Sequence, residues 1–65
     1  MNPMEISQQE SSKIIDKRNP LGLFYVKEND GTFTGIDNSD GNAWVEEFEK
    51  LDVCLAWLRR EIEVF

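Results

Sequence analysis

Two clusters of turn-forming residues divide the middle of this chain and constrain its fold more than any other feature. The first is Asn29-Asp30-Gly31, and the second runs from Asn38 to Asn42 through Ser, Asp and Gly. Asn, Asp and Gly tolerate the positive φ angles that tight hairpins need. Short segments rich in apolar and β-branched residues lie around these clusters, so residues 21–48 are predicted to form a three-stranded antiparallel β-meander.

The two ends of the chain carry helical patterns of unequal strength. Apolar residues recur at helical spacing from Leu51 to Ile62, which predicts an amphipathic helix over residues 50–63. Residues 1–20 form a polar leader, in which Asn2-Pro3 favours the start of a short helix over residues 4–17. The expected fold is therefore α+β, a single domain over residues 1–65 in the order α-β-β-β-α.

Length and composition limit the classes of protein that the chain can belong to. A chain of 65 residues buries only about 60% of its unfolded surface, so its core is small. One cysteine cannot form an internal disulfide, and without histidine we expect no metal site and no cofactor. No apolar run approaches the roughly 20 residues of a membrane span, and the N-terminus lacks a signal-peptide pattern. A cytoplasmic protein is expected.

Residues suited to catalysis are scarce in this sequence. The chain has no histidine, and Cys54 falls on the apolar stripe of the C-terminal helix, where a buried thiol is inert. Glu46 and Glu47 are neighbours on a predicted strand, so their side chains point to opposite faces and cannot share a proton. We therefore expect no enzymatic activity.

Residues 37–42 resemble a calcium-binding loop in composition. An EF-hand loop needs an oxygen ligand at its fifth position and a glutamate at its twelfth. Counted from Asp37, these positions hold Gly41 and Phe48, so hairpin chemistry explains the same residues better. Nucleotide binding has no support either, since no glycine-rich loop opens a helix.

The excess negative charge lies in one stretch of the chain. Residues 28–52 carry eight acids and one base, a net charge of −7, whereas the whole chain has −6. Such a concentration attracts a basic protein surface and repels nucleic acid. A solvated sheet face that only keeps the chain soluble is the alternative explanation. The candidate partner-binding acids are Glu28, Asp30, Asp37, Asp40, Glu46, Glu47 and Glu49.

The chain also has more aromatic residues than its small core is expected to hide. There are seven, whereas one sheet face and one helix cover about four or five. An exposed aromatic beside carboxylates is typical of a protein–protein hot spot, and Trp44 and Trp57 are the candidate anchors. The same surplus supports an alternative, a structural or assembly module that forms a homodimer.

Two resemblances concern the scaffold. The expected element order is that of double-stranded-RNA-binding domains, whose phosphate-contacting lysines have only Lys50 as a counterpart. The stretch from Phe24 to Leu58, which ends in Phe48-Glu49-Lys50-Leu51 and Ala56-Trp57-Leu58, resembles the arm-type DNA-binding domains of phage integrases. Those domains lay a basic sheet into DNA. Because the corresponding strands here carry acids, the resemblance implies the scaffold without the DNA binding, and a nucleic-acid-binding sheet domain remains only a third alternative, which the charge disfavours.

A third resemblance concerns function. The segment Tyr25-Val26-Lys27-Glu28-Asn29-Asp30-Gly31, followed by Ile36-Asp37-Asn38 and Gly41-Asn42-Ala43-Trp44, is similar to small acidic proteins of phages and prophages in Gram-positive bacteria. The resemblance implies an accessory protein that binds and inhibits a host nucleic-acid-handling protein, as anti-CRISPR proteins and DNA mimics do. The implied partner is a basic protein surface in the bacterial cytoplasm, and no role of an individual residue is implied.

Overall fold

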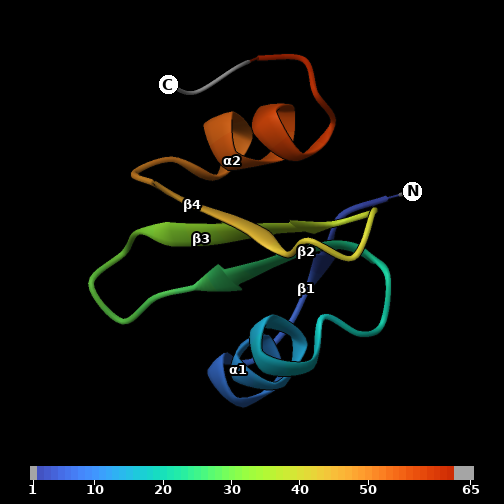
Figure 1. Ribbon diagram of the computed structural model, residues 1–65. Helices are drawn as coiled ribbons and strands as arrows, with labels where there is room; N and C mark the ends of the chain where they lie inside the picture. Colours follow the sequence, from blue (N-terminus) through green and yellow to red (C-terminus); the bar gives the residue numbers. More distant parts are fainter. Residues whose placement is uncertain (1, 63–65) are drawn as a thin grey trace.

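The turn clusters close three strands into the expected meander, and a fourth strand joins them from the leader. In the computed structural model, which describes residues 2–62, β2 (Gly22–Lys27), β3 (Phe33–Asn38) and β4 (Trp44–Phe48) pair antiparallel in sequence order. A two-residue strand, β1 (Met4–Glu5), pairs parallel with β2. The sheet order is β1-β2-β3-β4, with one helix on each face (Figure 1). The α+β class is confirmed, and the prediction of three strands is wrong.

The leader helix begins later than predicted because a capping box fixes its start. In α1 (Gln8–Lys17), the Glu10 N–H donates to Ser7 Oγ (3.1 Å) and the Ser7 N–H donates to Glu10 Oε1 (3.2 Å). The residues before Ser7 are therefore extended, and the Ile6 N–H donates to the Tyr25 carbonyl (2.9 Å). The prediction that a helix starts at Asn2-Pro3 is wrong, since the next two residues, Met4 and Glu5, form β1 instead.

The second helix, α2 (Leu51–Leu58), is shorter than the predicted helix over residues 50–63. Arg60 has a left-handed backbone (φ 60°), its N–H donates to the Trp57 carbonyl (3.0 Å), and the Glu61 N–H donates to the Ala56 carbonyl (2.8 Å). These two bonds form a Schellman motif, which ends a helix. Ile62, the last residue of the predicted stripe, is exposed, and residues 63–65 lie outside the described part of the chain.

Apolar side chains on both faces of β2 give the molecule two small cores. On the α1 face the buried cluster consists of Ile6, Ile14, Phe24, Val26 and Ile36. On the α2 face it consists of Leu23, Phe48, Cys54 and Leu58, with Tyr25, Phe33, Leu55 and Trp57 packed against it. This strand is therefore covered on both sides, and we call the two groups the α1 core and the α2 core.

A glycine in the central strand lets α2 pack closely on the sheet. A Cβ atom at Gly35 would meet the Trp57 ring at 3.0 Å and Cys54 Sγ at 3.1 Å, closer than ordinary van der Waals contacts. The Cys54 side chain is fully buried there, as predicted, and burial raises the pKa of its thiol to about 11. Such a thiol stays protonated and is a poor nucleophile at neutral pH.

Candidate functional site

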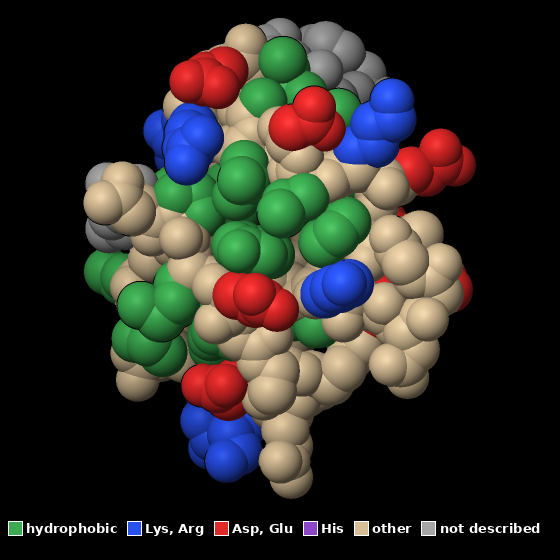
Figure 2. Space-filling model, turned by 180° about the vertical axis from the view of Figure 1, so that it is seen from behind, with side chains coloured by type: hydrophobic (Ala, Val, Ile, Leu, Met, Phe, Trp, Pro, Cys, Tyr) green, Lys and Arg blue, Asp and Glu red, His purple; other side chains and the backbone are tan. Residues whose placement is uncertain are grey.

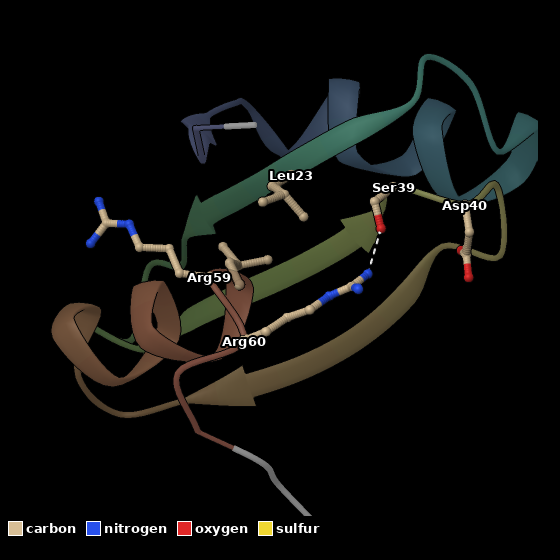
Figure 3. A pocket seen from close by; sticks show the side chains of 6 residues that line it. Leu23, Ser39, Asp40, Arg59 and Arg60 are labelled. Carbon is tan, nitrogen blue, oxygen red and sulfur yellow. Dashed lines mark hydrogen bonds between the residues drawn. The ribbon is translucent and has the colours of Figure 1, made fainter.

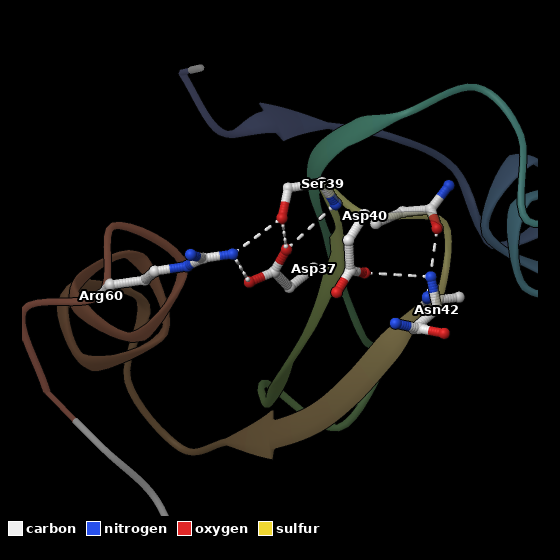
Figure 4. A network of polar contacts seen from close by, with 7 residues as sticks. Asp37, Ser39, Asp40, Asn42 and Arg60 are labelled. Atoms are coloured by element: carbon white, nitrogen blue, oxygen red, sulfur yellow. Dashed lines mark hydrogen bonds and ion pairs between the residues drawn. The ribbon is translucent and has the colours of Figure 1, made fainter.

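Asp37, one of the candidate acids, lies near the end of β3 and is held by groups of its own chain. Its Oδ1 accepts hydrogen bonds from the Ser39 N–H (3.1 Å) and the Ser39 Oγ–H (2.6 Å). Arg60 reaches over from the end of α2, where its Nη2 donates to Ser39 Oγ (2.8 Å) and lies 3.5 Å from Asp37 Oδ2 (Figure 4). Because Asp37 is buried and its charge is paired, it is unsuited to contact a partner.

The rest of this turn is held by a second set of internal hydrogen bonds. Asn38 is fully buried, its Nδ2 donates to the Pro20 carbonyl (2.8 Å), and its Oδ1 accepts from the Ala43 N–H (3.1 Å). Asp40 Oδ1 accepts from the Asn42 N–H (3.0 Å), and hydrogen bonding from the Asn42 backbone and side chain lowers the pKa of Asp40. The residues that resemble a calcium loop in composition therefore act as turn residues.

A hollow of about 540 Å³ lies beside this network and is open to solvent. Leu23 and Leu58 give it an apolar wall, and Ser39, Asp40, Arg59 and Arg60 complete its lining. Arg60 extends along it toward Ser39, whereas the Arg59 side chain leaves in the other direction (Figure 3). Of the two arginines that line the hollow, Arg60 is thus engaged with Asp37 and Ser39.

The acids of the first turn are also used inside the chain. Asp30 Oδ1 accepts hydrogen bonds from the Thr32 Oγ1–H (2.6 Å) and the Thr32 N–H (3.0 Å). Both bonds lower the pKa of Asp30, and the bond from the Thr32 side chain has the larger effect. Glu28 accepts from Thr34 Oγ1 (2.7 Å) and from the Gln8 side-chain amide, so it links the sheet to α1. Both residues stabilise the β2–β3 hairpin and its contact with the helix.

The remaining candidate acids lie on or directly after β4, the outermost strand of the meander. Glu46 pairs with Gly35 and therefore projects on the α2 side of the sheet, whereas Glu47 pairs with Thr34 and projects on the α1 side. Glu47 and Glu49 are exposed and Glu46 is half-buried. Within residues 2–62, no hydrogen bond or ion pair engages the side chains of these three acids.

The two candidate tryptophans have different environments. Trp57 is half-buried in the α2 core, with its ring centroid 5.4 Å from that of Phe48, so its role is to pack. Trp44 is 60% exposed at the start of β4, and its neighbour Val45 is 45% exposed. We use the name β4 edge for Trp44, Val45, Glu46, Glu47 and Glu49.

The seven candidate acids thus form two groups and do not share one surface. Glu28, Asp30, Asp37 and Asp40 accept hydrogen bonds within the chain at the two opposite ends of β3, whereas the acids of the β4 edge remain free. On the face turned away from the view of Figure 1, acidic and basic side chains are interspersed around a hydrophobic centre (Figure 2). Negative charge is therefore not gathered on that face.

Sequence reasoning missed Ser39 and Arg60 as members of the polar network. The helix predicted over residues 50–63 includes Arg60 and indicates no contact between it and the sheet. The spacing Asp37-x-Ser39 was an available signal, because a carboxylate often accepts from the backbone two residues on. Nothing local in the sequence announces the contact between Arg60 and Asp37, which joins residues far apart in the chain.

Comparisons with known protein families, with curated proteins and with solved structures give no match. Over residues 2–62, neither helix has the length and apolar character that a membrane crossing requires. The same residues contain no group of three or more His, Cys, Asp or Glu side chains placed to hold a metal ion. The function of the chain is therefore inferred from its own geometry.

Proposed function

We propose that this chain is a non-enzymatic binding protein whose β4 edge contacts a basic surface of a partner protein. One observation carries the proposal: the fold uses four of the candidate acids internally and leaves Glu46, Glu47 and Glu49 without a partner beside an exposed tryptophan. Free carboxylates next to an exposed aromatic combine electrostatic attraction with a large apolar contact, which is the composition of an interaction hot spot.

The charge of the β4 edge favours a protein over a nucleic acid as the partner. Three carboxylates on or beside one strand repel phosphates, whereas they raise the association rate with a basic protein surface. Proteins that handle nucleic acids carry such surfaces. The proposal therefore includes the partner class that the resemblance to phage accessory proteins implies, a host nucleic-acid-handling protein that is inhibited when its basic surface is covered.

The proposal is tested by reversing the charge of the β4 edge. A triple variant Glu46→Lys, Glu47→Lys and Glu49→Lys is compared with a control of equal charge change, Glu5→Lys, Asp16→Lys and Glu61→Lys, whose positions are exposed and lie outside the β4 edge. Tagged proteins are used in a pull-down from bacterial lysate at low and high salt. We expect a basic protein that the native chain and the control retain at low salt and that the β4 variant loses.

Partner binding that survives the charge reversal would contradict the proposal. Retention of the same proteins by the β4 variant and the native chain would exclude the β4 edge as the contact surface. Circular dichroism of both variants shows whether the fold is retained. Because all six substituted side chains are at least partly exposed, both variants are expected to fold.

A second candidate function is self-assembly through the same strand. The exposed Trp44 and Val45 support it, because an apolar pair on an outer strand can be covered by a second copy. Light scattering distinguishes the two candidates. A dimer that persists at high salt and is lost in Trp44→Ser supports assembly, and a monomer supports the binding of a basic partner.

A further inference from the structure

The hydrogen-bond pattern of the sheet determines which N–H and C=O groups of β4 point toward β3 and which point outward. The Glu28 N–H donates to the Thr32 carbonyl (2.9 Å), in register with the β2–β3 ladder. Since hydrogen-bonded pairs alternate along an antiparallel ladder, Thr34 and Ile36 bond to β2, whereas Phe33, Gly35 and Asp37 bond to β4. The residues of β4 that bond to β3 are Trp44, Glu46 and Phe48. The N–H and C=O groups of Val45 and Glu47 therefore point away from the sheet.

This outer edge of β4 is suited to accept another strand. It is five residues long, contains no proline, and has no strand beside it within residues 2–62. The opposite edge of the sheet, β1, has only two residues. Short edge strands resist pairing with other chains, whereas a longer one with free N–H and C=O groups can add a strand.

We propose that the β4 edge binds an extended basic segment of the partner by strand addition, with hydrogen bonds to the N–H and C=O groups of Val45 and Glu47. The inference rests on the proposed function and adds the binding mode. Directly opposite residues share a face of the sheet, so an antiparallel partner strand would place basic side chains opposite Glu47 and Glu46 and apolar ones opposite Val45 and Trp44. Read from its N-terminus, the partner segment carries two basic residues followed by two apolar or aromatic ones.

Charge favours this occupant over a second copy of the chain. Pairing β4 with β4 of another copy would bring six carboxylates onto adjoining strands about 4.8 Å apart, and like charges across strands are destabilising. Each copy also carries a net charge of −6, so approach of two copies is opposed at long range. A basic segment is instead attracted to the chain at long range, and its charges lie opposite carboxylates once it is paired with β4.

A designed peptide tests the binding mode without changing the protein. The probe is the amide Lys-Thr-Lys-Lys-Val-Tyr, in which the third to sixth residues would lie opposite Glu47, Glu46, Val45 and Trp44 in turn. In the proposed register, the N–H groups of its third and fifth residues point to β4, and those of its fourth and sixth point to solvent. N-methylation of the third and fifth residues should weaken binding at least about tenfold, and methylation of the fourth and sixth should change it by about twofold or less.

A protein variant provides an independent measurement. Val45→Pro removes an outward N–H without removing a β3–β4 hydrogen bond, which is where an edge strand tolerates proline. Val45→Thr keeps the N–H and the β-branched shape and serves as the control. We expect Val45→Pro to weaken binding of the unmethylated peptide about tenfold, and Val45→Thr, which keeps the N–H and loses only apolar contact, to weaken it about threefold or less.

The experiments separate failure of the binding mode from failure of the proposed function. If both methylated peptides bind alike and the triple charge reversal still abolishes binding, strand addition is overturned and an electrostatic contact at the β4 edge stands. If the charge reversal leaves peptide binding unchanged, the proposed function is overturned as well. Failure of the native chain to bind the unmethylated peptide at low salt, or a salt-insensitive dimer joined through β4, also overturns the inference.

Discussion

The two helices are held in place by different means. α1 has a capping box at its start and a left-handed residue, Arg18, at its end, but it buries only Ser11 and Ile14. α2 has no side-chain cap at Lys50, yet it buries Cys54 and Leu58 and contributes further side chains to the larger core. Local hydrogen bonds thus stabilise the first helix, whereas tertiary packing stabilises the second.

This difference shows how a short chain stabilises helices that would not form alone. Helices of 10 and eight residues are too short to be stable in isolated form. One of them adds about 1 kcal/mol through its cap, and the other gains more through buried apolar side chains. Packing should therefore contribute to the stability of both helices, and more to that of α2, whereas a side-chain cap should contribute only to that of α1.

The largest expected effect comes from removing a side chain of the α2 core. Leu58→Ala should destabilise the fold by about 3 kcal/mol, because Leu58 is almost fully buried against Leu23, Phe48 and Cys54. The matched change in α1, Ile14→Ala, should cost about 2 kcal/mol, since Ile14 lies in the smaller core. Urea unfolding followed by circular dichroism measures both. A greater loss for Ile14→Ala would reverse the comparison.

The next largest effect is a pH dependence of stability, which we expect from Cys54 in the α2 core. Burial raises the pKa of the Cys54 thiol to about 11 from a reference value of 9.0. Below pH 9 the thiol is protonated in both states; above it the unfolded chain loses the proton while the folded chain keeps it. Stability should therefore fall as pH rises from 9 to 11, by about 1 kcal/mol at pH 10.

The Cys54→Ala variant provides the control for this pH dependence. Its stability is lower at every pH because of the cavity, but its additional decline between pH 9 and 11 should be smaller than that of the native chain. Urea unfolding at several pH values gives both slopes. Equal slopes in the two proteins would show that the thiol is not shielded by α2 as the structure indicates.

Much of the fold was predictable, because the features that define it are local. Turn residues at Asn29-Asp30-Gly31 and the apolar and β-branched segments around them predict the meander, and helical periodicity predicts α2. β1 has no such signal: two residues are too few to show a period, and their parallel pairing with β2 depends on the position of α1. The end of α2 was misplaced because Arg60, and not glycine, occupies the left-handed position.

The candidate site was predictable in part. Alternation along a strand correctly placed Glu46 and Glu47 on opposite faces. Which acids the fold uses internally could not be read from charge alone, because Asp37 meets Arg60 only after α2 has packed on the sheet. The partial burial of Trp57 likewise depends on how α2 packs on the sheet.

Loss of the cap of α1 should have a smaller effect than loss of the Leu58 side chain from the α2 core. Ser7→Ala removes the oxygen that accepts the Glu10 N–H and should destabilise the protein by about 1 kcal/mol. Ser12→Ala is the matched control, because Ser12 is an exposed serine within α1 whose hydroxyl donates to the Gln8 carbonyl. The control should change stability by less than about 0.5 kcal/mol in the same urea assay. If both variants lose the same free energy of unfolding, the capping box does not stabilise α1.

The smallest expected effect concerns Arg60, where the end of α2 and the polar network meet. A left-handed backbone at a non-glycine residue costs about 1 kcal/mol, and Arg60→Gly removes this cost. It also removes the exposed guanidinium that contacts Asp37 and Ser39, a contact that contributes about 0.5 kcal/mol. Arg60→Gly should thus stabilise the protein by about 0.5 kcal/mol, whereas Arg60→Ala keeps the strain, loses the contact and should destabilise it. If both variants lose stability equally, the Arg60 backbone is unstrained, and the contact with Asp37, more than the Schellman motif, fixes the end of α2.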